Sequence, residues 1–414
     1  MVKSTSCTTI DFMNMSQLTE RTFTSSESLS SLSLFLSLAR GQCRPGKFWH
    51  RRSFRQKFLL RSLIMPRLSV EWMNELSHWP NLNVLLTRQP RLPVRLHRPY
   101  LAANLSRKQL LEALRYHYAL LRGCMSAEEF SLYLNTPGLQ LAKLEGKNGE
   151  QFTLELTMMI SMDKEGDSTI LFRNSEGIPL AEITFTLCEY QGKRTMFIGG
   201  LQGAKWEIPH QEIQNATKAC HGLFPKRLVM EAACLFAQRL QVEQIIAVSN
   251  ETHIYRSLRY RDKEGKIHAD YNAFWESVGG VCDAERHYRL PAQIARKEIA
   301  EIASKKRAEY RRRYEMLDAI QPQMATMVFS PFFTGDFGNL FSCYLCWKAV
   351  MAFSITYAAN RFPESVVIGM DLAFFIAITQ AAVNMRFIAD GNNLLYLQTL
   401  GKQTGRFHHE AFGK

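Results

Sequence analysis

Three polar side chains follow a predicted buried strand, Gln244–Ser249, at a place where sheet enzymes hold catalytic groups. They are Asn250, His253 and Tyr255. A tyrosine at this position can act as a general acid toward a departing thiolate, and a histidine can act as a base. Asparagine is also a preferred N-cap residue, so Asn250 is a candidate cap for the next helix. The alternative is that all three serve only capping and ordinary packing.

A glycine-containing loop, His221–Arg227, enters a predicted helix at Pro225. The start of a helix presents free backbone N–H groups, and its dipole favours an anion there. Lys226 and Arg227 place positive charge at this unfavourable end, so they require an anionic partner. That partner is either a ligand phosphate, which would make Gly222, Lys226 and Arg227 cofactor-binding residues, or an acidic side chain of the protein.

Glycines also gather at residues 199–203, near the end of a strand-like segment. Their spacing is not that of a dinucleotide-binding loop. They either let a ligand approach the strand end, with Gln202 and Gly203 in contact with it, or permit a β-bulge. Weaker candidates for a base or a positioning role are His210, His221 and Glu231.

No standard hydrolase, kinase, dehydrogenase or zinc motif occurs in the sequence. Cys343 and Cys346 form a lone CxxC pair, which without a second pair of ligands does not indicate a metal site. The chain has nine cysteines, and their scattered positions do not form a disulfide framework. This pattern favours a reducing compartment.

The elements that would position these residues follow from the hydrophobic pattern. Residues 141–201 contain short alternating runs separated by turns, which is typical of an antiparallel meander. A helix with Pro225 in its first turn and the buried strand Gln244–Ser249 come next. A meander followed by strand, helix and strand predicts an α+β fold, with the last strand beside the end of the meander.

The segment Arg40–Arg67 contains nine Lys or Arg residues, no Asp or Glu, and several aromatic residues, including Trp49 and Phe58. This mixture suits a helix on an anionic membrane, with the aromatic rings at the acyl boundary. The alternative is a solvated helix whose aromatic rings pack on the core. The net charge of +13 also favours anionic partners. Specific nucleic-acid binding is not expected, because no RNA- or DNA-binding motif accompanies the charge.

Composition divides the chain into five regions. We expect a leader at 1–14, a basic helical region at 15–140, an α+β core at 141–291, a basic C-terminal helix at 292–326 and a hydrophobic extension at 327–414. The basic helix, expected over Ala292–Leu317, has either a solvated face or one that contacts phosphates at a membrane.

Several motifs together carry a family resemblance: FIGGLQG (197–203), TKACHGLFPKRL (217–228), AVSNETHIYR (247–256), DYNAFWESVGG (270–280) and RAEYRRRYEML (307–317). Through them, residues 15–326 resemble the VirK/YbjX family of enterobacterial proteins. The resemblance implies a role in the Gram-negative envelope: outer-membrane integrity, surface presentation of a virulence factor, and resistance to cationic antimicrobial peptides. Together with the basic charge and the scattered cysteines, this leads us to expect a bacterial cytoplasmic protein, peripheral on the inner membrane, with an anionic membrane surface and envelope or virulence proteins as partners.

A more distant resemblance concerns residues 150–290, whose strand, glycine loop, helix and strand are similar to the GNAT acyltransferase arrangement. It implies a GNAT-like core in which His221–Arg227 hold the pyrophosphate of acyl-coenzyme A and Tyr255 protonates the departing thiol. The usual glycine-rich loop is reduced to Gly222. The expected activity is transfer of an acyl or aminoacyl group, from acyl-coenzyme A or another acyl donor, to a lipid, a sugar or a protein amine. The alternative is a non-enzymatic adaptor on the membrane surface.

Overall fold

The computed structural model describes residues 30–79, 82–260 and 270–325, which all lie in one compact unit, Met1–Phe333. The expected leader, 1–14, and the expected hydrophobic extension, 327–414, fall outside the described residues, as do Cys343 and Cys346. None of the helices in the described ranges has both the length and the apolar content needed to cross a membrane.

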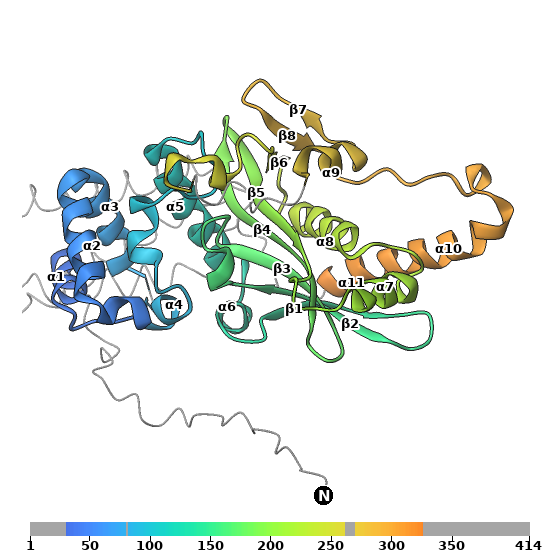
Figure 1. Cartoon of the computed structure of the whole chain (residues 1–414), viewed down its shortest axis with the longest axis horizontal. Helices are drawn as coiled ribbons and strands as arrows, with labels where there is room; N and C mark the ends of the chain where they lie inside the picture. The colour runs from blue at the N-terminus through green and yellow to red at the C-terminus, as the bar shows by residue number, and fades with distance from the viewer. Residues whose placement is uncertain (1–29, 80–81, 261–269, 326–414) are drawn as a thin grey trace, which may run out of the picture. The chain divides into compact units, whose positions relative to one another are not determined.

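The centre of the unit is one open sheet of eight strands in the order β1-β2-β3-β4-β5-β6-β8-β7 (Figure 1). Their bounds are β1 Leu139–Glu145, β2 Gln151–Thr157, β3 Ser168–Asn174, β4 Pro179–Tyr190, β5 Lys193–Gly203, β6 Gln244–Val248, β7 Val281–Cys282 and β8 His287–Leu290. The neighbours β5 and β6 are parallel, and every other neighbouring pair is antiparallel. The predicted α+β class with a mixed, mostly antiparallel sheet is therefore confirmed.

Helices from the N-terminal part of the chain gather on one side of the sheet, where α5 packs against β4 (Figure 1). They are α1 Ser31–Arg40, α2 Arg52–Ile64, α3 Pro66–Ser77, α4 Leu82–Arg88, the 3₁₀ helix η3 Leu92–His97, α5 Arg107–Cys124 and α6 Ala127–Leu134. Ser106 caps α5 and Ser126 caps α6, each in a capping box that satisfies N–H groups of the first turn.

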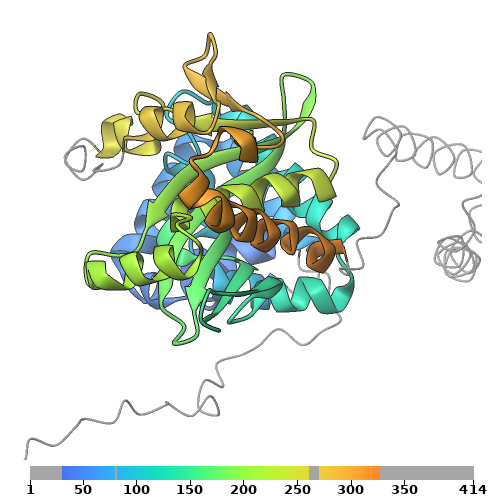
Figure 2. The ribbon, with the colours of Figure 1, turned by 90° about the vertical axis from the view of Figure 1, so that its right-hand side faces the viewer.

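The other side of the sheet is covered by later helices, with α8 packed against β3, β4 and β5. Figure 2, which faces this side, shows α10 and α11 crossing in front of the strands. The bounds are α7 His210–Ala219, α8 Pro225–Arg239, α10 Ser304–Asp318 and α11 Ile320–Ala325, with α9 Tyr271–Ser277 beside β8. The alternation of side chains along β4 fits this division: Phe185 packs against Phe236 of α8, and Thr186 hydrogen-bonds to Tyr100 on the opposite face.

The aromatic side chains of the basic segment pack inward. Trp49 and Phe58 are buried, with ring centroids 5.3 Å apart, and Trp49 Nε1 donates to the Pro90 carbonyl. The expectation of aromatic rings at an acyl boundary is therefore wrong for these two residues, because the core offers them more apolar contact. The large apolar side chains that α2 does expose are aliphatic: Leu59, Leu60, Leu63 and Ile64.

The basic C-terminal helix is shorter than expected. Helix α10 begins at Ser304, and residues 292–303 form an irregular connection that contains one 3₁₀ turn, Ile299–Glu301. Contacts with α8 hold this connection: Gln238 Nε2 donates to the Ala292 carbonyl at 2.9 Å, and Ile294 is buried. These tertiary contacts outweigh the helical preference of the segment.

Candidate active site

The parallel strands β5 and β6 stop pairing after Ile198 and Ala247. Beyond that point β5 continues beside β4 as far as Gly203, while β6 ends at Val248 and leads into Asn250. We call this point the strand fork. In open sheets with parallel strands, ligands bind where neighbouring strands part in this way.

A loop between β2 and β3, residues 163–167, lies directly against β5 at the fork. A Cβ on Gly199 would stand 1.9 Å from the Glu165 carbonyl oxygen, and a Cβ on Gly200 would stand 1.7 Å from Glu165 Oε2. The β4–β5 register also shifts here, with Gly199 as the extra residue of a bulge. Both glycines thus make room for the protein's own loop.

Glu165 is the central group of the fork. Its side chain is 2% exposed, and Gln202 Nε2 donates to its two carboxyl oxygens at 3.2 and 3.3 Å. Burial raises the pKa of Glu165 to about 8, because the charged form loses its hydration. A carboxyl group with such a pKa is protonated at neutral pH and becomes a base only slightly above it, which is the property of a tuned catalytic acid or base.

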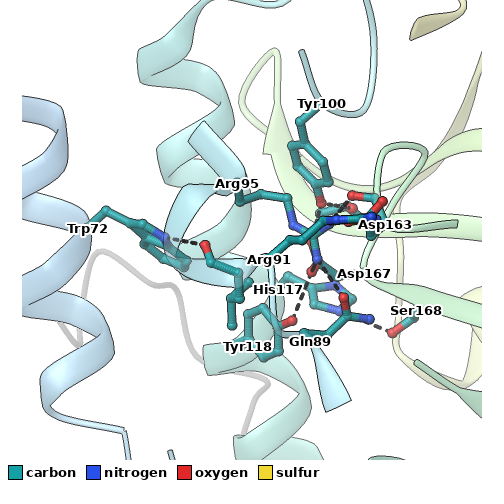
Figure 3. Close-up of polar contacts among 12 residues, drawn as sticks. Trp72, Gln89, Arg91, Arg95, Tyr100, His117, Tyr118, Asp163, Asp167 and Ser168 are labelled. Atoms are coloured by element: carbon teal, nitrogen blue, oxygen red, sulfur yellow. Dashed lines mark hydrogen bonds and ion pairs between the residues drawn. The ribbon is translucent and has the colours of Figure 1, made fainter. Parts of the chain in front are cut away.

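Buried ion pairs hold the two ends of this loop (Figure 3). Arg95 Nη2 lies 3.0 Å from Asp167 Oδ1, Arg95 Nη1 donates to the Asp163 carbonyl, and Arg91 Nη1 lies 3.2 Å from Asp163 Oδ2. Tyr118 donates to Asp167 Oδ1 at 2.9 Å. With both ends of the loop anchored, Glu165 in its middle is directed at β5.

Tyr255 is half-buried beside this group. Burial, and secondly the charge of Glu165, raise the pKa of Tyr255 to about 12, so its hydroxyl keeps a proton to donate at neutral pH. Lys164 Nζ lies 5.3 Å from the centroids of both the Tyr255 and the Tyr260 rings, and the two rings meet edge to face at 5.8 Å.

His253 lies under Tyr255 in a neutral state. Burial lowers the pKa of His253 to about 4, and its Nδ1 accepts the Tyr255 backbone N–H at 3.3 Å. The His253 ring stacks on Tyr271 at 5.0 Å, and the Tyr271 hydroxyl accepts the Leu201 N–H at 3.3 Å. This pKa makes His253 a poor base at neutral pH, and its contacts position the two tyrosines.

Asn250 joins the end of β6 to the start of α9. Its Nδ2 donates to Asp270 Oδ1 and its Oδ1 accepts the Tyr271 N–H, both at 2.9 Å. The sequence predicted Asn250 as the cap of the following helix, but that role falls to His253, which caps the 3₁₀ turn Ile254–Arg256. The prediction was wrong because the α9 contacts occupy the Asn250 side chain.

The glycine loop before α8 contacts charged side chains of the protein itself. Arg227 Nε lies 3.1 Å from Glu231 Oε1 within α8, so its anionic partner is an acidic side chain. A Cβ on Gly222 would stand 2.7 Å from both Glu309 Oε1 and Arg313 Nη2 of α10. Helix α10 therefore closes this face of the loop.

Lys226 lies against Gly203, the last residue of β5, beyond the fork. A Cβ on Gly203 would stand 3.3 Å from Lys226 Cε, so Lys226, Gly203 and Gln202 share the end of β5. Burial lowers the pKa of Lys226. The structure thus places Gln202 against Glu165, His253 against Tyr255, and Gly203 against Lys226 at the end of β5, whereas Gly222 and Arg227 face α10 and Glu231.

The weaker candidates lie apart from the fork. His210 is exposed at the start of α7, Glu231 is paired with Arg227, and His221 lines a separate surface pocket. Within the described residues, no group of three or more His, Cys, Asp or Glu side chains is placed to hold a metal ion.

Sequence reasoning missed Glu165 and Lys164. The signal available was the sequence Asp163-Lys-Glu-Gly-Asp167, a charged loop between two predicted strands with a glycine that lets the backbone pack closely. A Cβ on Gly166 would stand 2.7 Å from the Phe185 carbonyl oxygen. Charged residues in such a tightly packed loop are candidates for burial and hence for shifted pKa values.

Comparison with known proteins finds a matching family and several similar proteins. Residues 47–326 match the family model described as "Protein of unknown function (DUF535)". The chain is 99% identical over 327 residues to the "Uncharacterized protein YbjX" of Escherichia coli (strain K12), covering 79% of this chain and 99% of that protein. It is also similar to an uncharacterized protein of Haemophilus influenzae, at 30% identity over 172 residues, 41% of this chain and 56% of that protein.

Proposed function

The chain belongs to the DUF535 family, and on that premise we propose that it transfers an acyl or aminoacyl group to an amine at the strand fork. The observation that supports this proposal is Glu165, a buried carboxyl group with a pKa of about 8, which Gln202 orients and whose charge acts on Tyr255. A base and an acid with separated pKa values are what amine acylation requires.

In the proposed reaction, ionised Glu165 takes a proton from the acceptor amine, whose nitrogen attacks the acyl carbonyl carbon. The C–N bond forms, the bond to the leaving oxygen or sulfur breaks, and Tyr255 gives its proton to the leaving group. Solvent exchange then removes the proton from Glu165 and returns one to Tyr255. Because the pKa of Glu165 is about 8, the rate is expected to rise with pH up to that value.

The acyl donor is inferred from the chemistry of the proposed reaction and not from the glycine loop. The loop expected to hold the pyrophosphate of acyl-coenzyme A does not fit that group, since α10 covers Gly222 and Glu231 neutralises Arg227. The proposal therefore specifies the donor only as an ester or a thioester. The parallel pair of β5 and β6, with α8 between them in sequence, supports an acyltransferase of the GNAT type.

The setting we propose is the inner face of the Gram-negative envelope, in line with the family resemblance. The acceptor would then be an envelope lipid, sugar or protein amine, and its modification would affect outer-membrane integrity and resistance to cationic peptides. The test compares envelope extracts of a deletion strain that carries wild type, Glu165→Gln, Tyr255→Phe or the exposed control Glu145→Gln. Mass spectrometry is expected to find an acylated amine with wild type and Glu145→Gln only; the same products with all four proteins would refute the proposal.

A second candidate function is a membrane-surface adaptor. On α2, Leu60, Leu63 and Ile64 are 59%, 76% and 69% exposed on a helix that also carries Arg52, Arg55 and Arg61. Exposed aliphatic side chains among arginines suit the surface of an anionic bilayer. An adaptor would lose envelope function with Leu63→Ser plus Ile64→Ser and keep it with Glu165→Gln, whereas the transferase would lose it with Glu165→Gln.

A further inference from the structure

An open pocket of about 530 Å³ lies beside the candidate active site, and we call it the arginine pocket. Its walls come from His97 at the end of η3, Arg107 at the start of α5 and the segment Arg256–Arg259 that follows Tyr255. Among the described residues that line it, three are arginines and none is Asp or Glu. Its volume is in the range of pockets that hold small organic ligands.

Further arginines surround this pocket and repel one another. Burial lowers the pKa of Arg61, Arg98 and Arg107, and the positive charge of Arg259 lowers each of them further. Tyr260 counteracts this lowering of the pKa for all three arginines, and Asp163 does so for Arg98, but Asp163 is itself paired with Arg91 and Arg95. Like charges held close together destabilise a protein unless an anion joins them.

Within the described part of the chain, no acidic side chain forms an ion pair with Arg61, Arg98, Arg107 or Arg259. Two lining residues also carry buried polar atoms that have no hydrogen-bond partner among the described residues, His97 Nδ1 and Ser257 Oγ. Such buried atoms are uncommon in folded proteins and require an explanation.

A second basic pocket shows the contrast. It measures about 770 Å³ and is lined by Lys147, Lys218 and Arg312, but also by Glu150 and Glu309. The acidic side chains there balance the basic ones within the protein. In the arginine pocket, no described lining residue is acidic, so none balances Arg107 and Arg259 in this way.

We propose that the arginine pocket binds a phosphomonoester or diphosphate group. Guanidinium groups suit this ligand because their paired N–H donors match two phosphate oxygens at once. The position next to Tyr255 would present the rest of a phosphorylated molecule to the strand fork. The inference concerns binding alone and does not depend on the proposed transfer reaction.

The test measures pyrophosphate binding to the full chain by isothermal titration calorimetry. Arg259→Gln removes an exposed arginine of the pocket, and Arg312→Gln removes a matched arginine of the second basic pocket. We expect wild type to bind and Arg259→Gln to bind about tenfold more weakly, the effect of one lost charge-assisted hydrogen bond. Arg312→Gln and Glu165→Gln should bind as wild type does, so failure of the transfer proposal leaves this result intact.

The source of the phosphate is distinguished with vesicles of phosphatidylcholine, with and without phosphatidic acid. A lipid headgroup as ligand predicts sedimentation that requires phosphatidic acid, weakens with Arg259→Gln and is competed by pyrophosphate. A free phosphorylated molecule predicts pyrophosphate binding with no preference for phosphatidic acid. The inference is overturned if wild type binds neither probe, or if Arg259→Gln and Arg312→Gln weaken binding equally.

Discussion

Arg95 and Asp167 form a buried ion pair, with Arg95 Nη2 3.0 Å from Asp167 Oδ1 and side chains only 3% and 0% exposed. The same carboxylate accepts hydrogen bonds from Tyr100 and Tyr118. Arg95 belongs to the N-terminal helical region and Asp167 to the edge of β3, so one carboxylate joins the two parts of the core. The pair also holds the loop that presents Glu165 to the strand fork.

Loss of this arginine is expected to be strongly destabilising. Arg95→Leu leaves the buried Asp167 without the Arg95 guanidinium and leaves Asp163 with Arg91, which costs about 3–5 kcal/mol of unfolding free energy. The exposed pair Arg286–Glu251 serves as the control, since Arg286→Leu should cost less than about 1 kcal/mol. Urea unfolding followed by circular dichroism measures both values; equal losses would contradict the structural role of Arg95.

The pKa of Glu165 predicts an unusual dependence of stability on pH. Its folded-state pKa is about 8 against an ordinary value of 4.5, so between these values the folded state holds a proton that the unfolded state releases. The contribution of Glu165 to the unfolding free energy therefore falls as pH rises from 4.5 to 8, with a slope approaching about 1.4 kcal/mol per pH unit.

Glu165→Gln cannot ionise and should lose this dependence. The quantity to measure is the difference in unfolding free energy between wild type and Glu165→Gln at several pH values from 5 to 9. As pH rises, the unfolding free energy of wild type should fall relative to that of Glu165→Gln, and the difference should become constant above about pH 8. A difference that stays constant over this range would show that the Glu165 carboxyl has an ordinary pKa.

Much of the fold is predictable from local pattern, because the meander strands alternate and are separated by turns, and Pro225 occupies the first turn of α8 as expected. The fork itself is not predictable in this way. Burial against Gly199 and Gly200 raises the pKa of Glu165, and these residues are distant in sequence from Glu165 and adjacent to it only after the sheet has formed. The length of α10 was missed for the same reason, since contacts with α8 determine it.

His117 is expected to remain neutral, with its hydrogen on Nε2. Its Nδ1 accepts the Leu187 backbone N–H at 3.0 Å, so in the neutral ring Nε2 must carry the hydrogen, which is directed at Ser168 Oγ at 3.1 Å. Burial lowers the pKa of His117 to about 4. Its contribution to stability is therefore present above pH 6.5 and is lost as pH falls toward 4.

Nitrogen-15 NMR of the His117 ring checks this assignment. At pH 6 we expect the shift pattern of the neutral Nε2–H tautomer. A charged His117 ring at pH 6, or a hydrogen on Nδ1, would contradict the hydrogen bonds described for it.

Gly199 is expected to tolerate no side chain, because the backbone of the 163–167 loop occupies the space. In Gly199→Ala the new methyl group would stand 1.9 Å from the Glu165 carbonyl oxygen, so the loop must move, at a cost of about 1–3 kcal/mol. Gly203→Ala on the same strand is the matched control, since its methyl group meets only the flexible Lys226 side chain at 3.3 Å. Thermal unfolding should separate the two variants, and Gly199→Ala should also lower the pKa of Glu165 by admitting water. Similar melting temperatures would mean that the loop does not rest on β5.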